Sequence, residues 1–256
     1  MEQFRGFSSQ ISDSVQLSRP PVAIKFIDRL EDFRDIPIAQ GHRFCQLVMR
    51  ARQGEVLILT PDSISCPGAA AALGFKALPP NLEAGQMLKA FGIFMDQDKG
   101  ARTIRAMPRL ELGRYQGIIA APLSRVDFEP DVVIIEDEVE KLMWIALAWL
   151  NRQGGRLDFS TAILQAMCVD CAVIPFTQHR LDMTFGCYGC RDATDMKPGE
   201  ASLGFPADGL KDLASNLQFL TQKAIPNCRS KGIYKSLMTK IAPKGLGSDE
   251  GGGNLS

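Results

Sequence analysis

The chain has 256 residues, of which 45% are hydrophobic and 23% are charged, as in an ordinary globular protein with a sizeable core. Its 29 basic residues equal its 29 acidic residues in number, which excludes binding of nucleic acid or an anionic membrane through overall charge. No apolar run reaches the ~18 residues that a membrane span needs, and residues 1–20 lack the apolar core of a secretory signal. We therefore expect a cytoplasmic protein that acts without nucleic acid or membrane.

Hydrophobic periodicity, turn residues and helix caps predict a chain in which helices and strands alternate. The predicted helices are residues 2–17, 44–52, a helix that starts at 67, 81–94, 101–107, 136–152, a helix within 160–171, and 208–223. The predicted strands are residues 21–26, 55–60, 117–123, 131–135, 180–185 and 200–205. Residues 28–42 and 96–100 are expected to be a loop and a turn, and residues 173–176 to lead into a loop. This succession predicts an α/β or α+β fold: a mixed sheet with flanking helices and a cysteine-rich segment packed against it.

Residues 1–242 are predicted to form one globular domain, with two closely packed lobes as the alternative. Residues 243–256 are polar and rich in glycine, so we expect a disordered tail there. Within the predicted helix 136–152, we interpret the first acidic residues, Glu136, Asp137 and Glu138, as partners of the helix dipole and not as catalytic carboxylates.

The chemistry of the chain is expected to lie in its seven cysteines, because a reducing compartment does not sustain a disulfide framework. Cys168 and Cys171 form one C-x2-C pair, and Cys187 and Cys190 form a second pair after fifteen intervening residues. Two such pairs make a four-thiolate set, which suits a tetrahedral zinc ion or an iron–sulfur cluster. We therefore predict these four cysteines to be metal ligands. The chain has only two histidines, which argues against a histidine-rich zinc site.

Two further cysteines and one arginine are candidates for binding the same cofactor. Cys45 lies in the first turn of the predicted helix 44–52, and Cys66 directly precedes Pro67, where a helix N-cap is expected. The partial positive charge at such a helix end favours a thiolate or a bound anion, although a small buried side chain would fit these positions as well. Arg191 could balance the charge of a cluster, bind an anionic ligand or form a surface salt bridge. Cys228 is interpreted as a spare thiol.

Several motifs together resemble the domain-of-unknown-function family 169. The motifs are PVAIKF at 21–26, FCQLVMRARQGEVLILT at 44–60, CPGAAAALGF at 66–75, APL at 121–123, PDVVII at 130–135, FGCYGCR at 185–191 and GFP at 204–206. The resemblance covers roughly residues 20–225. It implies a single α/β-type domain that occurs in prokaryotes, many of them anaerobes. The chemical feature of this family is its cysteines, and its reaction is not established.

The resemblance also bears on the choice of ligands. It implies that Cys45, Cys66, Cys168 and Cys187 match the family, whereas Cys171 and Cys190 are less uniform there. A cluster could therefore take its ligands from Cys66, from one member of the first pair and from one member of the second pair.

Three functions compete at this stage. The first is an iron–sulfur protein, of the [4Fe–4S] kind, with a redox or cluster-dependent role, because the thiols outnumber the four that a structural zinc needs. The second is a structural zinc module in a binding or regulatory protein. The third is a metal-free protein whose pairs cycle between dithiol and disulfide. We expect a redox partner protein or a small anionic ligand as its partner.

Overall fold

The computed structural model describes residues 2–228, so the predicted tail at 243–256 lies outside the described residues. The chain divides into two compact units, residues 1–218 and 219–256. The first unit contains the sheet and six of the seven cysteines. The described part of the second unit holds the end of one helix, α10, and the short helix α11. The predicted single domain over residues 1–242 stays a prediction.

Six strands form one sheet in the described part of the chain, in the order β2-β3-β1-β4-β6-β5. The strands are β1 (Val22–Ile27), β2 (Leu57–Leu59), β3 (Gly117–Pro122), β4 (Val132–Glu138), β5 (Asp182–Thr184) and β6 (Glu200–Pro206). Each of these strand pairings is antiparallel, and parallel contacts occur as two isolated bridges, Ile38–Ile58 and His42–Ile64. The predicted fold of helices and strands is thus confirmed. The sheet itself is antiparallel, whereas we expected a sheet with both parallel and antiparallel pairs.

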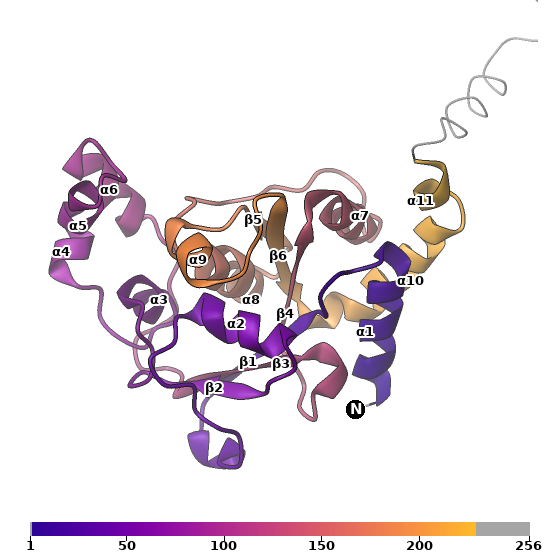
Figure 1. Cartoon of the computed structure of the whole chain (residues 1–256), viewed down its shortest axis with the longest axis horizontal. Helices are drawn as coiled ribbons and strands as arrows, with labels where there is room; N and C mark the ends of the chain where they lie inside the picture. The colour runs from indigo at the N-terminus through magenta and orange to yellow at the C-terminus, as the bar shows by residue number, and fades with distance from the viewer. Residues whose placement is uncertain (1, 229–256) are drawn as a thin grey trace, which may run out of the picture. The chain divides into compact units, whose positions relative to one another are not determined.

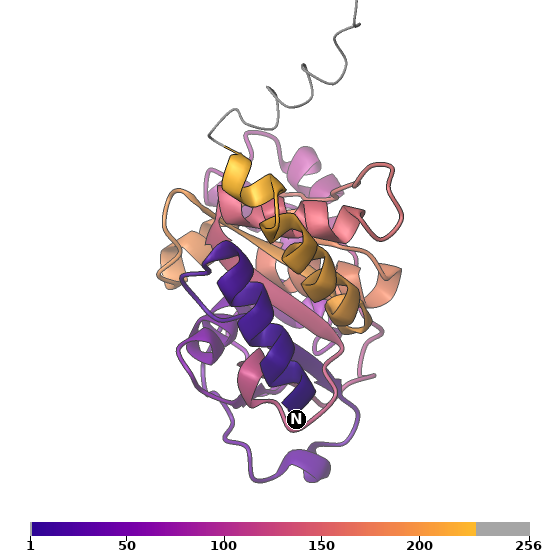
Figure 2. The same ribbon diagram turned by 90° about the vertical axis from the view of Figure 1, so that its right-hand side faces the viewer.

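Helices cover both faces of the sheet (Figures 1 and 2). The α-helices of the described residues are α1 (Glu2–Val15), α2 (Phe44–Arg52), α3 (Pro67–Ala72), α4 (Pro80–Glu83), α5 (Gln86–Ala90), α6 (Gln97–Arg105), α7 (Val139–Leu150), α8 (Ile174–Gln178), α9 (Tyr188–Ala193), α10 (Leu210–Thr221) and α11 (Ala224–Asn227). Short 3-10 turns are η1 (Leu30–Phe33), η2 (Leu123–Arg125) and η4 (Ala207–Gly209). The remaining element, η3 (Ala166–Val173), is a π-helix.

The main core lies between the sheet and the group formed by α2, α3 and η3. Successive side chains of a strand point to opposite faces, so Val22, Ile24 and Phe26 of β1 all enter this core. On the other face, α7 packs on β4 and β6, where the rings of Trp149 and Phe205 lie 5.5 Å apart between centroids. Figure 1 shows α4, α5 and α6 set away from the sheet, where they share a small apolar cluster of their own.

The prediction of one helix over residues 81–94 is wrong, because the segment forms two short helices, α4 and α5. Gly85 separates them with a left-handed φ of 74°, which glycine adopts readily. The predicted turn at 96–100 is also wrong. Asp96 caps α6 there by accepting a hydrogen bond from the backbone N–H of Asp98 at 2.8 Å, so α6 starts four residues before the predicted helix.

The interpretation of Glu136 and Asp137 as partners of a helix dipole is wrong. Both residues belong to β4, and α7 begins only at Val139. Glu136 is buried and accepts from Arg19 at 2.5 Å and from Arg52 at 3.0 Å. Glu136 therefore belongs to a buried charge network that fastens α2 to the sheet, whereas Asp137 pairs with Lys141 and accepts from Ser18. Residues 173–176 also differ from the prediction, because α8 begins at Ile174 directly after η3.

Candidate functional site

Four separate segments of the first unit deliver the cysteines to one region of the main core. Cys45 lies in the first turn of α2, Cys66 is the N-cap of α3, and η3 carries the first C-x2-C pair. Cys187 is the N-cap of α9, and Cys190 lies inside this helix. All six cysteines are free thiols that belong to the main core or pack against it. Side chains far apart in the sequence are thus neighbours in the fold.

The second pair is shaped by the start of α9. Gly186 has a φ of 83°, a left-handed value that turns the chain into the helix, and an added Cβ would lie 2.9 Å from the Met196 sulfur. The Cys187 sulfur then accepts a hydrogen bond from the backbone N–H of Cys190 at 3.3 Å. The two sulfur atoms of the pair lie 3.3 Å apart, with the Cys187 thiol as donor. The tight turn that the glycines predict is therefore completed by a helix cap.

The first pair lies in the π-helix η3, all eight residues of which are buried. A π-helix has a wider turn than an α-helix, so side chains three residues apart point in more divergent directions. The pKa of Cys168 is raised by burial and then by the charge of Cys66, Cys187, Cys190 and Asp170. Cys190 and Asp170 also act on Cys171, whose pKa is raised in addition by two further acids, Asp182 and Glu136. The two thiols of this pair therefore lie in different surroundings.

Close packing on the sheet holds η3 in place. Gly204 of β6 lies under Cys171, and a Cβ built on this glycine would come within 1.9 Å of the Cys171 carbonyl oxygen. A side chain of any size would push η3 off the sheet. Before η3, Gln165 has a left-handed φ of 51°, and its carbonyl oxygen accepts from the Cys168 thiol at 3.4 Å. Non-glycine residues in this region are uncommon and often occur near functional sites.

Burial and mutual repulsion raise the pKa of the thiols. Burial is the main cause that raises the pKa of Cys168 and Cys171 well above the ordinary value. The hydrogen bond to Cys190, followed by burial, raises the pKa of Cys187. For Cys190, the hydrogen bond with Cys187 lowers the pKa, but a hydrogen bond with Cys45 and burial outweigh it and raise the pKa to about 12. At neutral pH these four side chains are therefore thiols, unless a cation replaces their protons.

Asp170, which lies between the two cysteines of the first pair, has a perturbed pKa as well. Its carboxylate oxygen accepts a hydrogen bond from the Thr161 hydroxyl at 2.5 Å. Burial raises the pKa of this carboxyl to about 7, although the Thr161 hydrogen bond lowers it. Sequence reasoning missed Asp170, Gln165 and Gly204. The signal for Asp170 was a lone acid within the apolar run AMCVDCAVI, which indicates a buried carboxyl.

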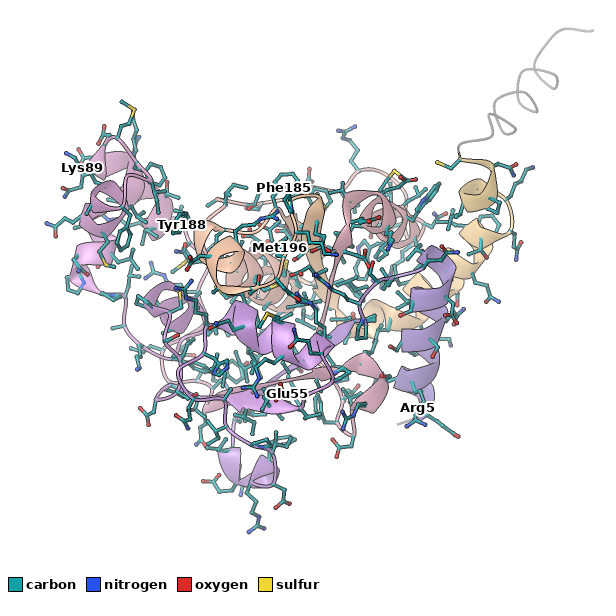
Figure 3. All side chains as sticks on the ribbon, in the orientation of Figure 1. Arg5, Glu55, Lys89, Phe185, Tyr188 and Met196 are labelled. Atoms are coloured by element: carbon teal, nitrogen blue, oxygen red, sulfur yellow. The ribbon has the colours of Figure 1, made fainter. Side chains whose placement is uncertain are left out.

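Arg191 fixes the loop around the second pair. Its guanidinium donates to the backbone carbonyls of Lys197, Phe185 (2.6 Å) and Glu200 (2.9 Å). Figure 3 labels Phe185, Tyr188 and Met196 around this loop, and the side chains of Phe185 and Tyr188 are exposed. The binding of a cluster or an anion by Arg191 stays a prediction. Cys228 is exposed in the second unit.

No group of three or more His, Cys, Asp or Glu side chains in residues 2–228 is placed to hold a metal ion. Within the same residues, no helix has the length and apolar character to cross a membrane.

Comparison with known proteins places the chain in a family. Residues 10–216 match the family of domain of unknown function 169, described as "Uncharacterised ArCR". An uncharacterised protein of Methanocaldococcus jannaschii is 28% identical over 226 residues, which cover 87% of this chain and 97% of that protein. No solved structure matches the chain. Because the match spans most of its length, the chain belongs to the domain-of-unknown-function family 169.

Proposed function

We propose that the chain binds an iron–sulfur cluster through its cysteines and has a redox or cluster-dependent role. The observation that carries this proposal is the approach of free thiols from α2, α3, η3 and α9 in one core region. Cysteine thiolates are the usual ligands of such clusters. Six thiols also exceed the four of a structural zinc site. When bound, the cluster would supply one-electron transfer.

Cys66, Cys168, Cys187 and Cys190 are the proposed ligands. The other three are the thiols that contribute to the raised pKa of Cys168, and each of the three comes from another segment or from the other pair. Cys45 is the reserve ligand, because it belongs to the same core and is among the groups that raise the pKa of Cys190. Cys171 is also a candidate, since Cys190 is among its neighbours. This set combines Cys66 with members of both pairs, as the family resemblance implied.

Backbone N–H groups in the same region suit sulfur ligands. The Cys187 sulfur accepts from the N–H group of Cys190 at the start of α9, and the backbone of Ala166 in η3 lowers the pKa of the same thiol. At the start of α3, the Cys66 side chain caps no N–H group of its own helix. Hydrogen bonds to ligand sulfurs tune the potential of a cluster. These contacts support a redox role over a purely structural one.

The second candidate is a metal-free dithiol protein, which one observation favours. The sulfur atoms of Cys187 and Cys190 are 3.3 Å apart at the start of a helix, a geometry from which a disulfide can form. The raised pKa of both thiols argues against this candidate, because the thiolate is the form that exchanges with disulfides. A structural zinc ion held by the two pairs remains the third candidate.

Metal analysis of protein purified and reconstituted without oxygen separates the three candidates. A cluster gives a brown protein with about four irons per chain, and Cys66→Ser, Cys168→Ser or Cys190→Ser lowers the iron content. The matched control is Cys228→Ser, which replaces an exposed thiol of the second unit and leaves the iron content unchanged. A colourless protein after reconstitution refutes the cluster. One zinc per chain that survives Cys66→Ser would support the structural zinc module instead.

Partners and location follow from the same proposal. A redox partner protein would dock near α9, because this helix brings Cys187 close to the exposed rings of Phe185 and Tyr188. Free thiols in all six core positions suit the reducing cytoplasm. Labelling of Tyr188→Cys with a cross-linker in cells tests both statements, since capture of an electron-transfer protein is the expected result.

A further inference from the structure

We propose that the cavity between α6 and the segment before η3 binds a small organic acid with an apolar body. This cavity has a volume of about 710 Å³ and lies in the first unit of the chain. Its polar walls come from Lys99, Arg102 and Thr103 on α6 and from Ser160, Thr161 and Gln165 on the opposite side. Cavities of this size accommodate typical small-molecule ligands.

The charge that the cavity offers to a ligand is positive. Lys99 and Arg102 lie three residues apart, so their side chains lie on the same side of α6. Both are exposed, and neither forms an ion pair with another of the described residues. The one carboxyl in the wall, Asp170, is 2% exposed and engaged by the Thr161 hydroxyl. A carboxylate is therefore the head group that the two cations would bind, with a bidentate contact to Arg102.

The rest of the cavity is apolar. Phe94, Met107, Leu164 and Val169 line it, and Leu164 also packs on the small apolar cluster of α4, α5 and α6. An apolar tail would bury hydrocarbon surface against these side chains, which favours binding roughly in proportion to the buried area. Inorganic phosphate would leave this wall without a partner. The ligand class is thus an amphipathic organic acid.

One residue connects the cavity with the cysteines. Gln165 lines the cavity, its carbonyl oxygen accepts from the Cys168 thiol, and its side chain lies within 2.9 Å of a Cβ built on Gly68, two residues after Cys66. A bound acid would therefore lie against Gln165, whose carbonyl oxygen accepts from the thiol of the proposed ligand Cys168. A role of this acid as substrate of the cysteine centre rests on the proposed function, whereas its binding does not.

Calorimetric titration of the full chain with hexanoate tests the inference. Hexanoate should saturate one site, and hexanamide, which has the same tail without the charge, should bind at least tenfold more weakly. Arg102→Gln should weaken hexanoate binding by about tenfold or more, because a charge-assisted hydrogen bond is lost. The matched control is Arg105→Gln, which removes the same charge from an α6 position outside the cavity wall and should leave the affinity unchanged.

Equal affinity for hexanoate and hexanamide would refute the inference, as would an equal loss in Arg102→Gln and Arg105→Gln or no saturable binding by the wild-type chain. A second measurement separates this result from the proposed function. The iron content of Arg102→Gln should equal that of the wild type, and Cys66→Ser should still bind hexanoate. If reconstituted protein lacks iron but binds hexanoate with this charge dependence, the cluster is wrong and the acid site is right.

Discussion

The metal-free protein should lose stability as the pH rises from 7.5 to 9.5. Burial raises the pKa of Cys168 and Cys171, and a hydrogen bond with Cys45 followed by burial raises that of Cys190 to about 12, so all three side chains stay protonated in the folded chain. In the unfolded chain, the same thiols ionise near a pKa of about 8.5. A group whose folded pKa lies above its unfolded pKa contributes its full stability below the unfolded value. That contribution is lost as the pH rises above it.

The magnitude follows from the linkage relation. At pH 9.5, one pH unit above the unfolded pKa, each buried thiol has lost about 1.4 kcal/mol of its contribution. Three buried thiols together lower the free energy of unfolding by about 4 kcal/mol between pH 7.5 and 9.5. Cys187 adds a further loss in the same direction, since its pKa is raised too. This effect is a large part of the ~5–15 kcal/mol that stabilise an ordinary domain.

Urea unfolding of the reduced protein, with a chelator and without oxygen, measures this loss at pH 7.5, 8.5 and 9.5. Cys171→Ala should reduce the dependence by about one quarter, because four thiols contribute to it, whereas Cys228→Ala, at an exposed position, should not change it. Burial raises the pKa of Tyr115 above 10, so the phenol contributes only above this pH range. Equal stability at pH 7.5 and 9.5 would refute the reasoning, because buried thiols could not then remain protonated.

A bound cluster or metal ion should reverse the sign. Ligand thiolates carry no protons, while the unfolded chain keeps its thiol protons below pH 8.5, so stability then rises with pH by up to about 1.4 kcal/mol per pH unit and ligand. The comparison of loaded and metal-free protein between pH 6.5 and 8 measures this reversal. A loaded protein whose stability falls with pH would show that the thiols do not hold the metal.

Three further predictions concern the surroundings of the site. Gly204→Ala should lower the free energy of unfolding by urea by about 3 kcal/mol or more, because the added Cβ would overlap the Cys171 carbonyl. The control Gly6→Ala lies in open space on α1 and should raise this free energy by up to about 1 kcal/mol, so equal effects of the two variants would contradict the packing. Glu136→Gln should cost about 3 kcal/mol at pH 7, since it leaves two buried or half-buried arginines without their shared carboxylate, and a cost below 1 kcal/mol would exclude this pairing. In the wild type, the Asp170 carboxyl has a folded pKa of about 7 and an unfolded pKa of about 4, so its free energy of unfolding falls as the pH rises between these values. Asp170→Asn lacks this loss, and its free energy of unfolding should therefore rise by about 3 kcal/mol relative to the wild type between pH 4.5 and 7.5. A constant difference between the two proteins would contradict the raised pKa.

Local signals in the sequence located several elements of the fold and part of the site. The helix over residues 44–52 has the predicted bounds, since the apolar period and the following Gly54 both act within a few residues. Cys66 is the N-cap because Pro67 fits the first helical turn. The strand of residues 22–27 followed from the clean alternation of Val22, Ile24 and Phe26. In each case the deciding interactions lie within one turn or one strand.

Contacts between distant segments decided the features that were missed. The acids after Ile135 continue a strand because Arg19 and Arg52 neutralise Glu136 there, and neither arginine is near it in the sequence. The π-helix at Cys168 and Cys171 depends on Gly204 of β6, which admits the backbone of η3 at close range. The spacing of the two pairs predicted four thiols around one point, which stays a prediction, but it carried no sign of the acids Asp170, Asp182 and Glu136 that raise the pKa of Cys171.

The delivery of the thiols by four segments has a consequence for the life of the protein in the cell. Cys45 and Cys190 are separated by more than half the chain length, and the second pair is the last of the six core cysteines to be synthesised. No nascent fragment that ends before α9 therefore carries the complete thiol set. If the thiols hold a cluster as we propose, cells would load a finished apoprotein, whose thiols must be kept reduced until then.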